Sequence, residues 1–436
     1  MTPSDASYHR PLHTVALILT VATFPLIFLG GLVTTYGAGM SVPDWPNSYG
    51  YNMFLFPVSQ WVGGIFYEHT HRLKGTLVGF LAVMLVFQAY GPSRNSRTRQ
   101  VLGYSAASAL LIAIVWGGGV WILESAGRVS HEAAKSLQHG FAGSASLGLL
   151  FLAAWVARRR ESRRWLRRLT VVALVAVSVQ GLLGGLRVTE VNLTLAIIHG
   201  CFAQAFFCLT AFITVASSRW WVESPNNYAA DEQKHQPTEA GGVGVNARRI
   251  GRLSAVCWVI VFVQLIIGAT MRHHGAGLAI PDLPLAYGKL LPPTDAAGLA
   301  TVNQHRAWVL HEPPVTLNQV WLHFGHRIGA IVVSIALIGL LVVGWRLTRD
   351  RKLRWPLMFV GGLLVIQFSL GALTVYYRKP AEVASAHVAF GALLLLTLAV
   401  LSARAMRLAA VTSRARSGHA LQAVHAPPLR KVAANA

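Results

Sequence analysis

Long apolar runs separated by short polar connections dominate the pattern along this chain. The runs are each roughly 20 residues long, which is enough to cross the hydrocarbon core of a membrane as a helix. Ten such runs lie near residues 14–35, 72–90, 101–122, 137–157, 169–188, 194–217, 253–271, 321–345, 355–377 and 384–403. The pattern therefore predicts an all-α integral membrane protein with about ten transmembrane helices.

The composition agrees with this class of protein. Of the 436 residues, 54% are hydrophobic and only 12% are charged, which is about half the charged share of a soluble domain. The formal net charge of +22 would suit a nucleic-acid-binding protein, but the Lys and Arg residues gather in short connections between the apolar runs. Because that placement follows the positive-inside rule, the excess charge indicates membrane topology and no nucleic-acid partner.

The basic residues also orient the helices. Arg-rich connections alternate with connections that are longer or poorer in Lys and Arg, of which 36–67 and 272–320 are the longest. Since basic connections stay on the cytoplasmic side, both termini are predicted to be cytoplasmic and both long loops to face outward. The stretch before the first apolar run lacks a clear small-residue cleavage site, so this run is predicted to stay as a spanning helix.

Segments of the first half reappear in the second half. Residues 37–50, GAGMSVPDWPNSYG, and residues 275–288, GAGLAIPDLPLAYG, are identical at eight of fourteen positions. Further along, QGLLGGLRV at 180–188 resembles QFSLGALTV at 367–375. Several matches in the same order indicate an internal duplication.

A His-Arg pair that occurs in both halves completes the domain plan. It lies at 71–72 and at 326–327, and the offset between the halves falls by 67 residues before the next match. One helical hairpin needs about that length, and residues 101–157 supply it. We therefore predict two pseudo-symmetric four-helix bundles plus one inserted hairpin. The predicted domains are an N-terminal half (1–221, with the hairpin at about 101–157), a cytoplasmic linker (222–247), a C-terminal half (248–408) and a cytoplasmic tail (409–436).

Each half carries two intramembrane histidines in equivalent positions. They are His71 and His199 in the first half, and His326 and His387 in the second. Two histidines on facing helices can bind one heme iron from opposite sides, as in b-type membrane cytochromes. The three cysteines all lie inside apolar runs, which argues against a Cys-ligated metal. One such histidine alone could equally bond a helix carbonyl, but four at duplicated positions favour iron ligands.

A carboxylate distinguishes the first half from the second. Glu68 lies on the same helix face as His71, three residues earlier, whereas His323 precedes His326 at the same spacing. A carboxylate there can orient the imidazole, relay protons or stabilise a cation. We therefore predict chemistry in the first half and a fixed electron carrier in the second. The alternative is that Glu68 forms an interfacial ion pair with Arg72.

The sequence also predicts roles for other polar residues and for glycines. Arg72 and Arg327 are expected to bind heme propionates, with interfacial anchoring as the alternative. Asp44 and Asp282 are expected to cap short helices in a lid over each site. The glycines at 184, 185 and 371 are expected to admit a helix or a flat macrocycle. Further histidines are expected to be mostly solvated or interfacial: His69, His131, His273, His274, His305, His311 and His323.

Taken in order, these motifs resemble the heme A synthase family, which converts heme O into heme A for terminal oxidases. The motifs are GGLVTTYGAGMSVPDWP, ExxHR at 68–72, QGLLGGLRV with the following LAIIHG, GHRIGA at 325–330, and SAHVAFGALLL. The resemblance covers most of residues 15–403. It implies a duplicated four-helix-bundle architecture, oxidation of a ring methyl of heme O to a formyl group, and a location in the cytoplasmic membrane.

The resemblance also implies roles for particular residues and partners. His326 and His387 would ligate a heme b, His71 and His199 would flank the substrate heme O, and Glu68 would be the essential carboxylate. The expected partners are heme O, heme O synthase, the cytochrome oxidase assembly machinery and membrane lipid. No sequence feature identifies the electron donor.

Two departures from the family keep alternatives open. Family members usually have eight helices, so the inserted hairpin leaves His139 as an alternative to His199. Some members carry a Cys pair in the first outer loop, but residues 37–67 contain no cysteine, which excludes a thiol role there. Two other function classes also remain: a two-heme b-type electron carrier without heme chemistry, and a transporter that uses the histidines to bind its substrate.

Overall fold

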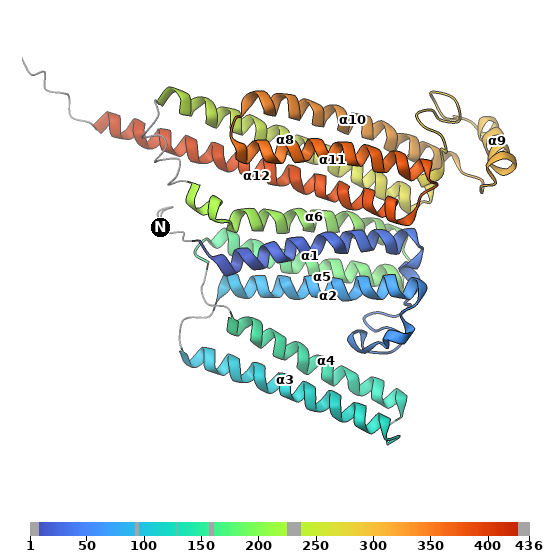
Figure 1. The fold of residues 1–436 in the computed structure, drawn as a ribbon, viewed down its shortest axis with the longest axis vertical. Coiled ribbons are helices and arrows are strands. Elements are labelled where there is room, and N and C mark those ends of the chain that lie inside the picture. Colours follow the sequence, from blue (N-terminus) through green and yellow to red (C-terminus); the bar gives the residue numbers. More distant parts are fainter. Residues whose placement is uncertain (1–7, 92–95, 129, 157–160, 225–236, 426–436) are drawn as a thin grey trace, which may run out of the picture.

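The computed structural model describes residues 8–91, 96–128, 130–156, 161–224 and 237–425. Within these residues the regular elements are helices, and ten of them are long and apolar enough to cross a membrane. The prediction of an all-α multi-pass membrane protein is therefore confirmed, with ten candidate spans among the described residues. The helices lie side by side with their axes close to one common direction (Figure 1).

Four helices form the first-half bundle. They are α1 (Arg10–Thr35), α2 (Gly63–Tyr90), α5 (Arg164–Thr189) and α6 (Leu193–Ser217). Apolar side chains from all four helices meet in one core, which includes Leu19, Leu85, Leu166 and Ile213, all fully buried. This core lies toward the ends of the helices that are far from the long loops.

Four more helices form the second-half bundle. They are α8 (Pro237–His273), α10 (Leu317–Leu347), α11 (Arg351–Tyr376) and α12 (Ala381–His425). Helix α8 begins within the segment predicted as a linker, and α12 continues into the predicted tail. The extension of α12 has a simple cause: residues 404–425 are rich in the helix formers Ala, Arg and Leu and contain no proline.

The two bundles pack directly against each other. Helix α12 contacts both α1 and α6. Gly31 permits a close approach, since a Cβ atom there would lie only 2.8 Å from Cβ of Ser385. Arg272, at the end of α8, donates across this boundary to the Gly31 carbonyl and to the Thr35 hydroxyl. The halves therefore share an interface close to their loop ends.

The inserted hairpin lies at the edge of the molecule. Its helices, α3 (Ser96–Ser125) and α4 (His131–Val156), pack mainly on each other, and α4 also contacts α2. In Figure 1 the pair lies on the far side of the first bundle from the second bundle. Large apolar side chains on α3 are exposed, among them Tyr104, Ile114 and Trp121, as expected for a helix that faces lipid.

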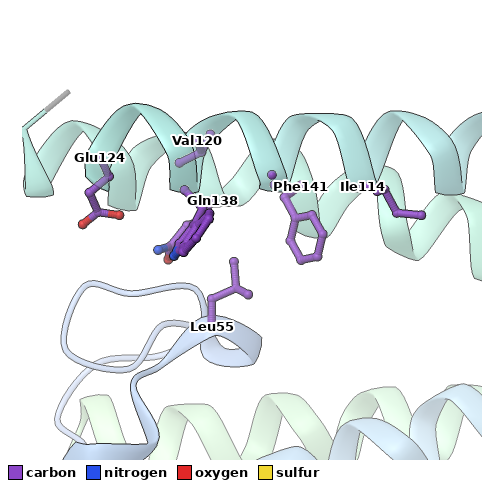
Figure 2. A pocket seen from close by; sticks show the side chains of 9 residues that line it. Leu55, Ile114, Val120, Glu124, Gln138 and Phe141 are labelled. Atoms are coloured by element: carbon purple, nitrogen blue, oxygen red, sulfur yellow. The ribbon is translucent and has the colours of Figure 1, made fainter. Parts of the chain in front are cut away.

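A cavity of about 330 Å³ separates the hairpin from the first outer loop. Figure 2 shows Leu55, from the short helix η3 (Met53–Leu55), pointing toward Gln138 and Phe141 of α4. Glu124 lies at one end of the cavity. The four intramembrane histidines at the predicted sites do not line it, so this cavity is separate from both predicted sites.

The two long loops emerge at the same end of the molecule (Figure 1). The start of α1 and the end of α12 lie at the opposite end. The second loop contains an unpredicted helix, α9 (Ala296–His305), whose first turn is capped by Asp295, which accepts a hydrogen bond from the Gly298 N–H at 2.7 Å. Hydrophobic periodicity did not predict α9 because this helix is short and lies within the loop instead of crossing the membrane.

The repeated PDWP and PDLP segments fold in the same way. Asp44 accepts hydrogen bonds from the backbone N–H groups of Tyr49 and Gly50, both at 2.8 Å, and Asp282 makes the corresponding pair in the second loop. The two aspartates therefore close turns, and the prediction that they cap short helices is wrong. Burial raises the pKa of Tyr287, whose hydroxyl donates to the Ala279 carbonyl within the second loop.

Candidate functional site

The structure brings the four predicted histidines together as two facing pairs. The imidazole rings of His71 on α2 and His199 on α6 have centroids 6.5 Å apart, with an angle of 72° between their planes. The rings of His326 on α10 and His387 on α12 have centroids 6.4 Å apart, at 79°. Both pairs lie near the loop ends of their helices, as predicted.

This spacing suits one metal ion between the two rings of each pair. Imidazole nitrogen–metal bonds are about 2 Å long, so two rings on opposite sides of one metal have centroids roughly 6 Å apart. No cluster of three or more His, Cys, Asp or Glu side chains suitable for a metal occurs among the described residues. An iron that already has four porphyrin nitrogens needs only two protein ligands, so the residues present fit heme.

Each of the four histidine rings lies against a glycine of a neighbouring helix. A Cβ atom at the glycine would approach Cε1 of the ring to between 2.9 and 3.2 Å, which is tighter than ordinary contact. The pairs are Gly30 with His71, Gly184 with His199, Gly268 with His326, and Gly371 with His387. Gly184 and Gly371 were predicted to allow close approach of a helix or a macrocycle. In the structure they leave room for the imidazole rings. Gly185 instead lies against the Trp45 ring.

Glutamines hold three of these histidines in place. Each glutamine lies one helical turn before the glycine that faces the ring, and its side-chain amide donates to the histidine carbonyl at 2.8 Å. The bonds join Gln180 to His199, Gln264 to His326, and Gln367 to His387. Leu26 occupies the fourth position, opposite His71. His71 therefore lacks the glutamine bond that its three counterparts have.

The ring of His199 is oriented by a further contact. Its Nδ1 lies 3.2 Å from the Gln180 carbonyl oxygen. Since that carbonyl can only accept, Nδ1 carries the proton, and Nε2 retains the lone pair that a metal requires. This is the common arrangement of metal-ligating histidines, whose second ring nitrogen bonds to a backbone or carboxylate oxygen.

Glu68 and His323 occupy equivalent positions, and each accepts a backbone N–H of the loop above it. Glu68 is 3% exposed and accepts from the Val42 N–H at 2.9 Å and from Arg72 at 2.7 Å. His323, also 3% exposed, accepts from the Ile280 N–H at 3.1 Å. The prediction that His323 is solvated is wrong, because this ring holds the second loop as Glu68 holds the first. What differs between the halves is the negative charge.

Arg72 and Arg327 both bind the loops above them. Their guanidinium groups donate to backbone carbonyls 2.6 to 3.0 Å away. Arg72 reaches Val42, Asp44 and Asn47, and Arg327 reaches Ile280 and Leu285. These bonds fix the loops over the histidine pairs. Contact between either arginine and a heme propionate stays a prediction.

His69 also contributes to the cover of the first site. Its side chain is fully buried, its Nδ1 lies 3.1 Å from the Ser48 hydroxyl, and its ring packs on Trp61 with centroids 4.7 Å apart. The expectation that His69 is a solvated bystander is therefore wrong. The sequence did not show whether this histidine at the start of an apolar helix is buried, because the folded loop covers it and the helix does not.

The hairpin does not complete the bundle around His71. Helices α1 and α5 pack on α2, and α6 packs on α1 and α5 and supplies the facing histidine, His199. His139 lies on α4, but its side chain is outside the described part of the structure. The fold thus places His199 opposite His71, whereas it places the backbone of His139 in the peripheral hairpin.

Arg187 is a residue of the first site that the sequence analysis missed. It lies in the last turn of α5, and its guanidinium lies so close to Gly39 that a Cβ atom there would overlap Nη2. It interacts electrostatically with Glu68, His71 and His199. Within the described ranges no hydrogen bond or ion pair engages its side chain. The site therefore contains a cation without a bonded partner.

A signal for Arg187 was present in the repeat. QGLLGGLRV and QFSLGALTV align so that Arg187 corresponds to Thr374. Thr374 bonds back to the Leu370 carbonyl within its own helix. A charged residue at a position that is neutral in the other copy of a transmembrane repeat indicates function by default. The difference between Arg187 and Thr374 was therefore the signal for this residue.

Comparisons with known proteins agree with the motifs. The family model described as "Cytochrome oxidase assembly protein" matches residues 137–400, more than half of the chain. The matched segment contains His199, His326 and His387, whereas Glu68 and His71 precede it.

Several relatives are named heme A synthase. The chain is 29% identical over 234 residues to "Heme A synthase" of Symbiobacterium thermophilum, covering 53% of this chain and 65% of that protein. It is 26% identical over 255 residues to "Heme A synthase 2" of Acidiphilium cryptum, covering 56% and 61%. The match to "Heme A synthase" of Shewanella oneidensis is 26% over 163 residues, covering 36% and 47%. The chain thus spans less than two thirds of each of these relatives.

Proposed function

The chain belongs to the cytochrome oxidase assembly protein family, and from this premise we propose that it is a heme A synthase. Its substrate would be heme O, and its reaction would oxidise a ring methyl to a formyl group to give heme A for terminal oxidases. The relatives named heme A synthase support this activity. Because each match covers under two thirds of the relative, the activity of the whole chain rests on the site as well.

One observation carries the proposal: two histidine pairs share one geometry, but among the described residues only the first has a buried carboxylate, Glu68, beside it. A pure electron carrier would need no such difference between its two sites. The ring separations of 6.5 and 6.4 Å suit a heme in each pair. Glu68 supplies the asymmetry, because its counterpart His323 makes the same loop contact without a negative charge. This favours the enzyme over the two-heme carrier.

The residues then receive distinct roles. His326 and His387 would hold a heme b, which supplies one-electron redox chemistry when bound. His71 and His199 would bind the iron of heme O and fix the plane of its ring. Glu68 would hold negative charge, or a proton, within the covered site where the methyl group reacts. The loop bonded to Glu68 and Arg72 would exclude water from that site.

The proposal extends to the whole molecule. We infer two pseudo-symmetric four-helix bundles in the cytoplasmic membrane, with both termini cytoplasmic and both long loops outside. The common end of the two loops and the opposite end of α1 and α12 support this orientation, together with the Arg-rich connections. The expected partners are heme O synthase, the source of the substrate, and the cytochrome oxidase assembly machinery.

Pigment analysis tests the function directly. The protein is produced in cells that contain a heme O source but no heme A synthase, and the extracted hemes are separated by chromatography. We expect heme A with the wild-type chain and heme O alone with His71→Ala or His199→Ala. Heme O without heme A, from a wild-type protein that is folded and heme-loaded, would exclude the enzyme and leave the electron carrier.

A further inference from the structure

We propose that Arg187 binds a propionate carboxylate of the heme held between His71 and His199, and so fixes how that macrocycle is rotated in the first site. This assignment rests on the proposed function only in taking a heme as the ligand. It makes Arg187 a substrate-binding residue that the second half lacks, since Thr374 stands in its place.

The local charge balance of the first site favours an anionic ligand. Arg187 and Arg72 bring two positive charges, while Glu68 is the one carboxylate among the electrostatic partners of Arg187 in the described structure. Glu68 is already bonded to Arg72 at 2.7 Å and to the Val42 N–H at 2.9 Å. One positive charge therefore remains uncompensated beside the histidines. A carboxylate is the natural partner, because guanidinium and carboxylate match in charge and geometry.

Arg187 is better placed than Arg72 for this role. Arg72 uses both terminal nitrogens on the loop, donating to three backbone carbonyls and to Glu68. Releasing it would uncover the site. The Arg187 side chain makes no hydrogen bond or ion pair with the described residues, so a ligand can bind its guanidinium without breaking any such bond seen there.

The position of the Arg187 side chain argues against simple anchoring at the membrane surface. A basic side chain near a helix end often extends into water. Arg187 instead lies beneath the outer loop against Gly39, with His71, His199 and Glu68 among its electrostatic neighbours. In the second loop the corresponding Gly277 has only ordinary contact, at 3.6 Å, with Lys379. That lysine comes from a loop, not from the helix behind the histidine pair.

The test compares binding of two probes that differ only at the propionates. Ferric protoporphyrin IX and its dimethyl ester are titrated separately into purified full-length protein whose second site already holds heme. The low-spin absorbance that appears reports occupancy of the first site. We expect wild type to bind the free acid roughly tenfold more tightly than the ester, as one charge-assisted contact would give. Arg187→Gln should abolish this preference by weakening binding of the free acid alone.

A matched control and an internal folding check accompany the titration. Lys379→Gln removes the cation near Gly277 and should keep the wild-type preference. The absorbance of the second-site heme should be unchanged in both variants, which shows that each is folded.

The outcomes separate this inference from the proposed function. If Arg187→Gln keeps the preference for the free acid, or weakens both probes equally, the assignment of Arg187 is wrong while the enzyme proposal stands. If Arg187→Gln loses the preference as expected but the wild-type protein makes no heme A from heme O, the role of Arg187 is confirmed and the enzyme proposal fails. Absence of any heme binding at the first site of wild type would overturn both.

Discussion

Glu68 and His323 lie at equivalent positions of the two sites but differ in charge. Glu68 and His323 both accept a backbone N–H from the loop above and both are buried. A neutral acceptor can therefore hold such a loop, so the charge of Glu68 serves either its ion pair with Arg72, at 2.7 Å, or chemistry at the site. Charges near the hydrocarbon region are costly and are generally retained for function.

Replacing Glu68 with glutamine separates anchoring from chemistry. Glu68→Gln keeps an acceptor for the Val42 N–H but removes the negative charge. We expect heme A formation to fall roughly 100-fold or more, in line with the loss of an acid–base group, while heme remains bound. Extracted pigments and the absorbance spectrum measure the two effects. His323→Gln, the matched change in the second half, should retain most of the activity; an equal loss in both variants would make Glu68 a loop anchor only.

The glycines beside the histidine rings offer a second prediction. A Cβ atom at Gly371 would lie 3.2 Å from the His387 ring, whereas Gly362 on the same helix has nothing within 4 Å. Gly371→Leu should displace the ring and remove the low-spin heme signal of the second site, measured by absorbance of the purified protein. Gly362→Leu should leave the signal intact. An unchanged spectrum in Gly371→Leu would contradict the ligand role of His387.

At the scale of elements, the helices that surround each histidine pair decide which residues can meet. Helix α6 packs beside α1 and α5, whereas the hairpin reaches the bundle through α4 on α2. The glutamine–glycine turn on α5, α8 and α11 then fixes the neighbouring histidine helix. Helix α1 has the glycine without the glutamine, so α2 is held at this point mainly by the loop bonds of Glu68 and Arg72.

The peripheral hairpin leads to a third prediction. If α6 supplies the fourth ligand, His139→Ala should retain the wild-type heme content and heme A formation within about twofold, as expected for a change away from the site. His199→Ala should lose the first-site heme. Heme quantification after purification measures both. Loss of the first-site heme in His139→Ala, with His199→Ala unaffected, would move the ligand to the hairpin.

At the scale of the whole molecule, both long loops lie at one end and the ends of α1 and α12 at the other. The interface between the halves is closed near the loop end by the bonds of Arg272 to Gly31 and Thr35. Both covered sites therefore lie close to the same membrane face, which makes the orientation of the protein important for its supply of substrate.

Cysteine labelling tests that orientation. Leu290, in the second loop, is 83% exposed, and Lys352 is exposed at the start of α11. In intact cells a membrane-impermeant maleimide should label Leu290→Cys, and it should label Lys352→Cys only after permeabilisation. The wild-type chain, whose three cysteines lie inside spans, gives the background. The reverse labelling pattern would invert the topology.

Much of this protein was determined by its sequence alone. Ten apolar runs sufficed for the spans, because a bilayer imposes length and hydrophobicity on each helix independently of its neighbours. The repeats equated His71 with His326 and His199 with His387, which placed two histidines in each half, and the fold brings the two histidines of each half face to face. The offset of the matches predicted an inserted hairpin at about 101–157, the region in which α3 and α4 lie at the edge of the molecule.

Only the tertiary structure decided what the polar groups at the helix mouths do. His69, His323 and Arg72 looked solvated or free to bind a ligand, yet the folded loops bury or engage them. Arg187 looked like one more basic residue, yet its side chain has no hydrogen-bond or ion-pair partner among the residues described. A hydrogen bond between segments far apart in the chain leaves no periodic trace in the sequence. Only the folded structure therefore shows which charged side chains are bonded within the protein and which are free to bind a ligand.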